Sequence, residues 1–205
     1  MKLKIFISPI LDANIYLLEN ENKECVIIDS GNPKMDEVIE YIEKENLDLK
    51  MIFLTHGHFD HILGLESILN YKNVPVYMGE EDIKFLYDHD YSLSKWVNLE
   101  YKLSEKYTII GLKGNEEIFN LKCLSTPGHT KGSFCYLDEK NNRIFTGDTM
   151  FKNTYGRTDF PTGNIDEMKE TLSSLLKLNG DMEVYPGHGS KTNINNEKNT
   201  YKRMF

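Results

Sequence analysis

Short apolar runs, rich in isoleucine, valine, phenylalanine and tyrosine, recur along the chain and predict β-strands. They cover residues 3–8, 14–19, 25–29, 51–54, 74–78, 116–126, 134–138, 143–146 and 183–185. Residues 139–142 join two of these runs over a length expected for a hairpin loop. Because the runs come in groups instead of alternating strictly with helices, they favour an α+β sandwich of two packed sheets over a doubly wound sheet.

Two other segments show the apolar spacing i, i+3, i+4, i+7 of a surface helix. The first has apolar side chains at Met35, Val38, Ile39 and Ile42. Asn32 and Pro33 precede it as the expected N-cap and first helical residue. The second has apolar side chains at Ile165, Met168, Leu172, Leu175 and Leu176, with Asn164 as the expected N-cap, Glu167 three residues later and Gly180 beyond its end. Each helix is expected to bury one face.

Residues 80–113 are the least regular part of the sequence. This segment holds many charged residues and the aromatic residues Tyr87, Tyr91, Trp96, Tyr101 and Tyr107, and helical stretches are expected around 80–88 and 98–106. No internal repeat, low-complexity tract or linker divides the sequence. We therefore expect a single domain over residues 1–205, with an irregular, aromatic-rich insertion at about 80–113.

The charge of the chain narrows the classes of partner. Its net charge of -8 and pI of about 5.3, without a clustered basic face, argue against nucleic acid and favour a small-molecule substrate. No run of about 18 apolar residues is present, and Pro9, Asp12 and Asn14 interrupt the N-terminal segment. Neither a membrane span nor a signal peptide is therefore predicted, and a cytoplasmic location is expected.

The three cysteines are odd in number, widely spaced and placed inside predicted strands. Cys25, Cys123 and Cys135 lie in ECVIID, LKCLST and SFCYL. This placement favours buried thiols over disulfides or metal ligands.

The segment THGHFDH, residues 55–61, concentrates half of the six histidines directly after the apolar run at 51–54. It supplies His56, His58, Asp60 and His61. Three further runs also end in a tight turn and a possible metal ligand, namely KCLSTPGHT with His129, RIFTGDT with Asp148 and MEVYPGHG with His188. Because a sheet brings the ends of its strands to one edge, these side chains are expected to converge on loops of a rigid scaffold. The remaining histidine, His89 in YDHDY, is expected at the surface.

The number and type of these ligands indicate two metal ions. One zinc ion takes about four ligands, so seven imidazole and carboxylate groups suit two ions that share a carboxylate. Imidazole with carboxylate and no thiolate suits zinc, iron or manganese. This set leaves a position open for water, as in catalytic metal sites.

The motifs THGHFDH, PGHT, TGDT and PGHG resemble the metal motifs of the metallo-β-lactamase superfamily. With GRTDFP at 156–161, the chain is most similar to its short glyoxalase II-like, or hydroxyacylglutathione hydrolase-like, members, and DSG at 29–31 matches the Asp-x-Gly before their first helix. The resemblance covers nearly the whole chain. It implies a four-layer αββα sandwich with a binuclear centre at one edge.

The resemblance also implies roles for the ligands. The first metal is expected on His56, His58 and His129, the second on Asp60, His61 and His188, with Asp148 bridging them. The predicted cofactors are two divalent ions, most simply zinc, with iron or manganese as alternatives. A hydroxide held between the ions would attack a thioester such as a hydroxyacyl-thiol, and the two predicted catalytic carboxylates are Asp60 and Asp148. A bridging aspartate, where several β-lactamases have cysteine, disfavours antibiotic hydrolysis.

Further residues are expected around the ligands. Four residues have side-chain oxygens that can orient the ligand imidazoles, namely Asp29, Thr55, Thr130 and Ser133. The alternative for each is a role in a turn or a cap only. Arg157 lies where glyoxalase II enzymes carry a basic residue for the thiol carrier's carboxylate, although an ion pair with Asp159 is the alternative. Those enzymes hold glutathione with a long helical region beyond the position of His188, and the residues after His188 here are not expected to supply the same contacts. The aromatic residues between Tyr87 and Tyr107 can form a substitute wall or simply pack as an insertion.

Other functions compete with thioester hydrolysis. Persulfide dioxygenases have the same metal motifs and a similar GRTDF segment, which would imply one iron and oxygen chemistry, but PGHG around His188 is more similar to the hydrolases. Lactonases and ribonucleases of the superfamily are further alternatives, and the acidic chain disfavours the ribonucleases. A metal-binding module without catalysis is disfavoured because all seven ligands are present.

Overall fold

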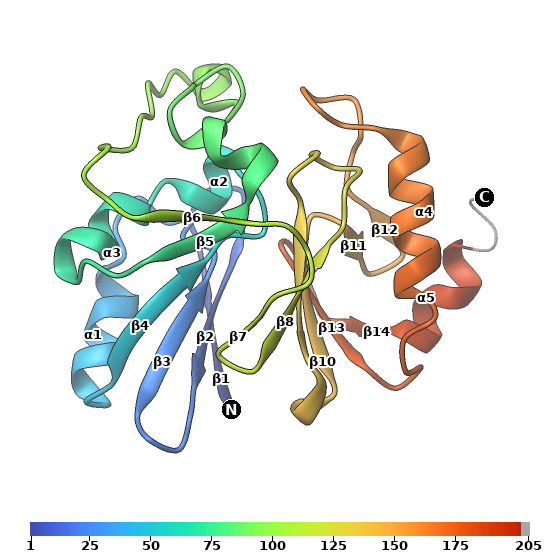
Figure 1. Ribbon diagram of the computed structural model, residues 1–205, viewed down its shortest axis with the longest axis horizontal. Coiled ribbons are helices and arrows are strands. Elements are labelled where there is room, and N and C mark those ends of the chain that lie inside the picture. The colour runs from blue at the N-terminus through green and yellow to red at the C-terminus, as the bar shows by residue number, and fades with distance from the viewer. Residues whose placement is uncertain (202–205) are drawn as a thin grey trace.

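Two six-stranded sheets pack face to face, with helices on their outer faces (Figure 1). The computed structural model describes residues 1–201. The first half of the chain forms one sheet and the second half forms the other (Figure 1). This arrangement confirms the α+β sandwich and its four layers.

The first sheet is antiparallel at one edge and parallel at the other. Its strands, in spatial order, are β1 (Lys2–Ile7), β2 (Asn14–Glu19), β3 (Glu24–Ile28), β4 (Asp48–Phe53), β5 (Val76–Gly79) and β6 (Ile109–Leu112). Parallel neighbours require a crossover connection. Helix α1 (Asp36–Lys44) connects β3 to β4, and α2 (Phe59–Ile62) and α3 (Leu65–Tyr71) connect β4 to β5.

The second sheet has the spatial order β14-β13-β10-β9-β8-β7. Its strands are β7 (Glu117–Ile118), β8 (Leu121–Ser125), β9 (Phe134–Asp138), β10 (Arg143–Gly147), β13 (Glu183–Pro186) and β14 (Thr192–Asn193). Helix α4 (Ile165–Leu175) connects the parallel pair β10 and β13, and a small hairpin of β11 (Met150–Phe151) and β12 (Thr154–Tyr155) precedes it. Helix α5 (Ile194–Tyr201) follows β14.

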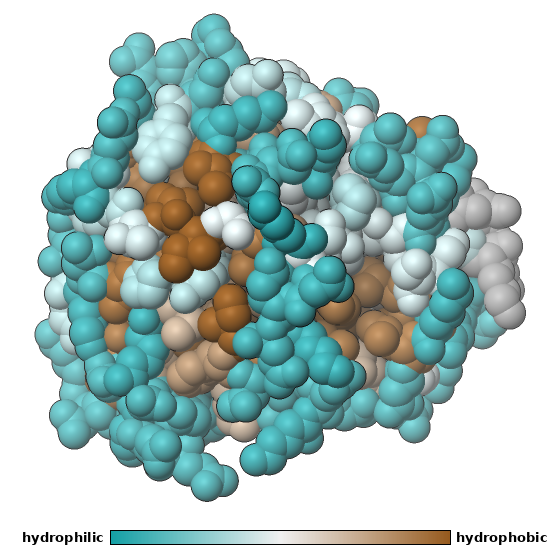
Figure 2. Space-filling view, in the orientation of Figure 1, coloured by the Kyte–Doolittle hydropathy of each residue, from teal (hydrophilic) through white to brown (hydrophobic). Residues whose placement is uncertain are grey.

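Three layers of apolar side chains hold the sandwich together. Strand β2 shows the principle, since successive side chains of a strand point to opposite faces. Its Ile15 and Leu17 pack under the helices of the first half, whereas Tyr16 and Leu18 pack between the sheets. On the face in Figure 2, hydrophilic side chains surround the areas where hydrophobic residues reach the surface.

The hairpin and the second surface helix lie where the sequence predicts them. Strands β9 and β10 pair antiparallel around a short 3₁₀ turn, Glu139–Asn141. Asn164 caps α4, its Oδ1 accepting hydrogen bonds from the amides of Asp166 and Glu167 at 2.9 and 3.2 Å. The three cysteines are free thiols and buried, as expected.

Two predicted boundaries are wrong. Helix α1 begins at Asp36, with Met35 rather than Asn32 at the N-cap, because Asn32 Oδ1 accepts the Lys34 amide at 3.1 Å in a local turn. The run at 116–126 is not one strand but the hairpin of β7 and β8. Phe119 and Asn120 form its turn with φ of 54° and 59°.

The segment 80–113 also differs from expectation. A 3₁₀ helix covers Glu80–Leu86 and another covers Ser94–Val97, whereas the helix expected around 98–106 is absent from the described chain. Ile109–Leu112, expected inside the insertion, is strand β6 and pairs with β5. Its four residues are too few to show a period in the sequence. None of the described helices is long and apolar enough to span a membrane.

Candidate metal centre

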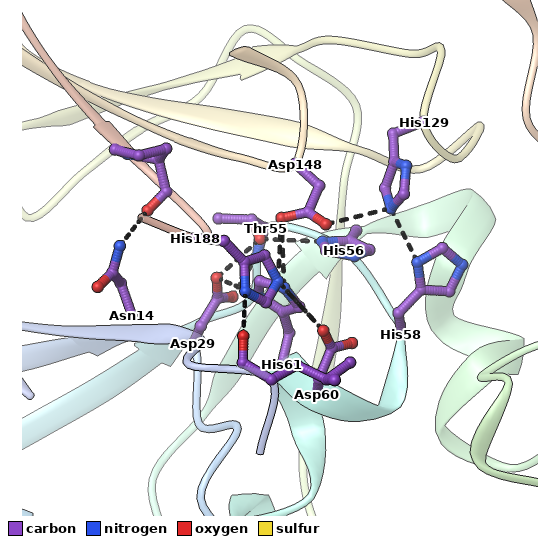
Figure 3. A network of polar contacts seen from close by, with 12 residues as sticks. Asn14, Asp29, Thr55, His56, His58, Asp60, His61, His129, Asp148 and His188 are labelled. Carbon is purple, nitrogen blue, oxygen red and sulfur yellow. Dashed lines mark hydrogen bonds and ion pairs between the residues drawn. The ribbon is translucent and has the colours of Figure 1, made fainter. Parts of the chain in front are cut away.

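The seven predicted ligands meet at one edge of the sandwich. They stand on the turns after four strands and on the short helix α2 (Figure 3). His56, His58, Asp60 and His61 follow β4, His129 follows β8, Asp148 follows β10 and His188 follows β13. They form three overlapping groups of three, and within each group the ligand atoms lie within 4.8 Å of one another. The third of these groups, His56, His61 and Asp148, joins the other two. Side chains from both halves of the chain therefore form one cluster.

The first group consists of His56, His58 and His129, all buried. His58 Nδ1 lies 2.9 Å from His129 Nε2. The ring of His56 lies edge-on to both, with centroids 4.8 Å away. These three imidazoles could together hold one metal ion.

The second group consists of Asp60, His61 and His188. His188 Nε2 lies 3.1 Å from Asp60 Oδ2 and 3.2 Å from His61 Nε2. Asp148 lies between the groups. Its Oδ1 is 3.4 Å from His61 Nε2, whereas its Oδ2 is 3.6 Å from His129 Nε2. One carboxylate thus presents one oxygen to each group.

Four of the five imidazoles have one nitrogen directed outward to an oxygen atom. These contacts are His56 Nδ1 to Thr55 Oγ1 at 3.1 Å, His61 Nδ1 to Asp29 Oδ2 at 2.8 Å, His129 Nδ1 to the Arg157 carbonyl at 2.7 Å and His188 Nδ1 to the Leu11 carbonyl at 2.9 Å. An outward Nδ1–H donated to oxygen leaves the inward Nε2 as a lone-pair donor. Metal-binding histidines commonly have this arrangement.

The inward atoms fit divalent ions as their partners. His56 Nε2 and Asp148 Oδ1 are buried and have no hydrogen-bond partner in the described structure. Buried polar atoms without partners are rare in folded proteins. Because the donors are imidazole and carboxylate, without cysteine, they suit zinc, iron or manganese.

Burial and neighbouring charges set the protonation of three of the candidate ligands. Burial, followed by the neighbouring His129, lowers the pKa of His58 to about 3, and burial and the surrounding imidazoles hold the pKa of His56 well below its usual value. Burial raises the pKa of Asp148, but the charges of His61, His129 and His188 hold it below the ordinary value. Near neutral pH the pocket therefore offers neutral His56 and His58 beside an ionised Asp148.

Glycine is required where the ligand loops approach each other. A Cβ on Gly187 would lie 2.2 Å from Asp148 Oδ1 and 2.8 Å from His61 Cε1. Any larger residue would displace the Asp148 carboxylate. The PGHG motif thus serves packing as well as the placement of His188.

The four residues expected to support the imidazoles separate into two pairs. Asp29 accepts the Thr55 amide and hydroxyl, each at 2.8 Å, besides His61 Nδ1. Thr130 and Ser133 make no hydrogen bond to an imidazole among the described residues. Their hydroxyls lie 2.7 Å from each other, and Thr130 donates to Asp82 Oδ2 at 2.7 Å.

Asp82 is a supporting residue that the sequence did not single out. It is fully buried and accepts the amide of Gly57 at 3.1 Å and that of Gly132 at 2.9 Å, besides the Thr130 hydroxyl. It therefore ties the loop of His58 to the loop of His129. Its position in EEDIKF, soon after a predicted strand, was a possible signal, but that segment was interpreted as an irregular insertion.

Asn14 plays a similar part beside His188. Its amide donates to the carbonyls of Pro186 and Gly189, both at 3.0 Å, and so fixes the PGHG turn (Figure 3). A lone asparagine in a strand gives no sequence signal for this contact. His89 lies outside the three ligand groups and is partly exposed.

A cavity of about 620 Å³ opens over the ligands. His58, Asp60, His129, Asp148 and His188 line its floor. Arg157 lines the same cavity, but its guanidinium donates to both carboxylate oxygens of Asp159, at 2.7 and 2.6 Å. The expected carboxylate contact of Arg157 remains a prediction.

Comparisons with known proteins identify the family. A family model for the metallo-beta-lactamase superfamily matches residues 9–188. A hydroxyacylglutathione hydrolase, GloC, of Haemophilus influenzae is 32% identical over 210 residues, covering 97% of this chain and 95% of that protein.

Two solved structures have the same architecture over nearly their whole length. The B3 metallo-beta-lactamase BLEG-1 superposes with a TM-score of 0.88 at 29% identity, covering 97% of each chain. TTHA1623 in a di-iron-bound form superposes with a TM-score of 0.87 at 26% identity, covering 96% of this chain and 98% of that one. The motifs, the fold and the converging ligands lead to one assignment: this chain belongs to the metallo-β-lactamase superfamily.

Proposed function

We propose that the protein is a binuclear metal-dependent hydrolase that cleaves a thioester, such as a hydroxyacyl-thiol. The observation that carries the proposal is Asp148, whose two oxygens face separate groups of ligands. The similarity to GloC supports a hydroxyacyl-thiol substrate. Two divalent ions bound here would supply hydroxide near neutral pH by lowering the pKa of water toward about 7.

The residues of the chain have distinct parts in this reaction. Asp60 and Asp148 supply two negative charges on the cavity floor, which leaves a net positive site when two divalent ions are bound. Two ions held by these residues would stabilise the oxyanion that develops on the attacked carbonyl. Water oxygen would join the acyl carbon as the C–S bond breaks, the thiol would leave as thiolate, and both protons of the water would pass to solvent, leaving a carboxylate product. Because thiolate leaves readily, the site requires no additional acid.

We assign zinc as the first candidate metal, with iron and manganese as alternatives. The donor set accepts all three. The di-iron form of TTHA1623 supports iron as the principal alternative. Metal analysis of purified protein is expected to give about two ions per chain.

The test combines metal analysis with a substrate panel. S-Lactoylglutathione, other thioesters, a lactone, a β-lactam and glutathione persulfide are supplied to protein with known metal content. We expect thioester hydrolysis to be fastest, and His58→Ala to abolish it while the fold is retained. His89→Ala is the matched control, because His89 lies outside the ligand groups. Oxygen uptake with persulfide and one iron per chain would instead show a dioxygenase, and retained turnover in His58→Ala would refute the metal mechanism.

A further inference from the structure

Apolar side chains make up much of the cavity lining beside the candidate metal ligands. We name them the apolar wall: Leu11, Leu93, Trp96, Val97, Phe151 and Phe160. They come from three separate parts of the chain, namely the β1–β2 connection, the segment of Leu93 and the 3₁₀ helix Ser94–Val97, and the segment from β11 to α4. An apolar surface built from distant segments directly over reactive groups is typical of a ligand site.

Three members of the wall are exposed to an unusual degree. Leu11 is 62% exposed, Trp96 67% and Val97 45%. Single exposed apolar residues are common on protein surfaces. Three gathered at the mouth of one cavity instead indicate a surface that a bound molecule covers.

The backbone holds the wall in a costly conformation. Leu93 and Asn98, which flank Ser94–Val97, both have left-handed φ, of 63° and 55°. Leucine rarely adopts this left-handed conformation, so tertiary contacts must stabilise it. The Ser92 carbonyl, next to Leu93, accepts the Phe59 amide at 2.8 Å, so the segment is tied to α2, which carries Asp60 and His61. The wall is thus fixed relative to the candidate metal ligands.

Aromatic contacts continue the wall down to the ligands. Trp96 packs edge-on against Phe160, with ring centroids 5.2 Å apart. Phe160 packs edge-on against the ligand His58 at 5.7 Å. An apolar group resting on Trp96 would therefore extend from the cavity mouth to the reacting centre.

Within residues 1–201, the cavity has no free cationic side chain in its lining that could bind the carboxylates of a thiol carrier such as glutathione. Arg157 is the only lysine or arginine among the described residues that line it, and both carboxylate oxygens of Asp159 already accept from its guanidinium. Arg157 also stacks on Phe160, 3.8 Å from the ring centroid. The whole chain has a net charge of -8. Glutathione-like carboxylates therefore find no unpaired cation in the cavity lining.

We propose that the substrate is a thioester with an apolar alkyl or aryl arm, which packs on Trp96 and Phe160, and that this arm rather than a charged carrier determines specificity. The proposal rests on the proposed thioester hydrolysis. Trp96 and Val97 are the specificity-determining residues, since they stand at the mouth and do not contact the ligands.

The binding test uses intrinsic fluorescence, because Trp96 is the only tryptophan in the chain. Non-hydrolysable thioethers serve as probes: S-methyl and S-hexyl derivatives of glutathione, which is charged, and of N-acetylcysteamine, which is not. A fully buried methylene strengthens binding about fourfold, corresponding to about 0.8 kcal/mol. For a half-open cavity we expect S-hexyl to bind at least about tenfold tighter than S-methyl on both carriers. Equal affinities for the two alkyl lengths, or a glutathione preference of about tenfold whatever the alkyl group, would overturn the proposal.

The kinetic test uses metal-loaded protein with acetyl and hexanoyl thioesters of the same thiol. In Trp96→Ala, kcat/KM is expected to fall about tenfold more for hexanoyl than for acetyl. Leu99→Ala is the control, because Leu99 is 40% exposed in the same segment but does not line the cavity. If both thioesters are cleaved with equal kcat/KM, thioester hydrolysis stands and the apolar-arm proposal fails. If no thioester is cleaved, the proposed function fails, and the fluorescence titration still decides whether the wall binds alkyl groups.

Discussion

Replacing Asp29 with asparagine tests whether the supports of the metal ligands control metal affinity. Asp29 is 1% exposed and accepts three hydrogen bonds, two from Thr55 and one from His61 Nδ1. The amide oxygen of asparagine can keep the Thr55 amide as a partner. Its NH₂ group then faces the Nδ1–H of His61, so two donors oppose each other. His61 can avoid this by moving its proton to Nε2, which removes the lone pair that the metal requires.

The structure sets the size of the expected effect. A lost hydrogen bond to a carboxylate costs about 1.5–3 kcal/mol. Loss of a group that supports a metal ligand weakens metal binding about 10- to 100-fold. His61 belongs to the second group, so the Asn variant is expected to retain about one ion per chain after dialysis against a chelator that leaves wild type with about two. The melting temperature is expected to fall by about 3–12 °C, at about 2–4 °C per kcal/mol for a chain of 205 residues.

The assay measures metal content by mass spectrometry across a series of chelator concentrations, with thermal melts of the same samples. Asp138→Asn is the matched control. Asp138 is also fully buried, but it pairs with Arg143 at 2.8 Å at the far end of β9 and β10. The control should lower stability without altering metal content. Equal metal retention by wild type and Asp29→Asn would refute the reasoning, whatever happens to the melting temperature.

Three further outcomes are expected. Arg157→Ala should change KM about equally for carboxylate-bearing and uncharged thioesters, because both carboxylate oxygens of Asp159 already accept from its guanidinium; a larger rise for the carboxylate-bearing ones would instead establish a carboxylate contact. The thiols of Cys25 and Cys135, whose pKa burial raises to about 12, should resist alkylation in folded protein near pH 8 and react once it unfolds; rapid alkylation of folded protein would contradict their burial. Burial raises the pKa of Asp82 from 3.8 to about 6 in the folded protein. As the pH rises, the unfolded chain therefore loses this proton before the folded protein does. Stability should therefore fall between about pH 4 and pH 6 by about 3 kcal/mol more in wild type than in Asp82→Asn, measured by urea unfolding; parallel pH profiles would refute this.

The ligands were predictable from sequence because each has a local signature. A run of apolar residues gives the strand, a glycine-containing turn gives its end, and histidine or aspartate follows directly. His129, Asp148 and His188 lie far apart in sequence, yet the rule that strands end at a common edge was enough to bring them together. The same rule separates them from His89, which follows no strand.

Other parts of the molecule had no such signature. Asp82 supports the loops of His58 and His129 through backbone amides that any sequence would offer. Strand β6 has four residues and becomes a strand because β5 offers a free edge. Leu93 adopts a left-handed conformation that leucine does not favour by itself. In each case tertiary contacts, absent from any local window, outweigh local preference.

The position of the ligands at the junction of two sheets makes the inner core part of the metal centre. The Tyr136 hydroxyl, from the second sheet, donates to the Leu54 carbonyl at 2.6 Å, just before the loop of His56. The Tyr16 hydroxyl, from the first sheet, donates to the Pro186 carbonyl at 2.5 Å, just before His188. Each sheet therefore holds the ligand loop of the other through a buried tyrosine. Since packed interiors do not deform continuously, the separation of the two ligand groups is set by side chains between the sheets that never reach the cavity.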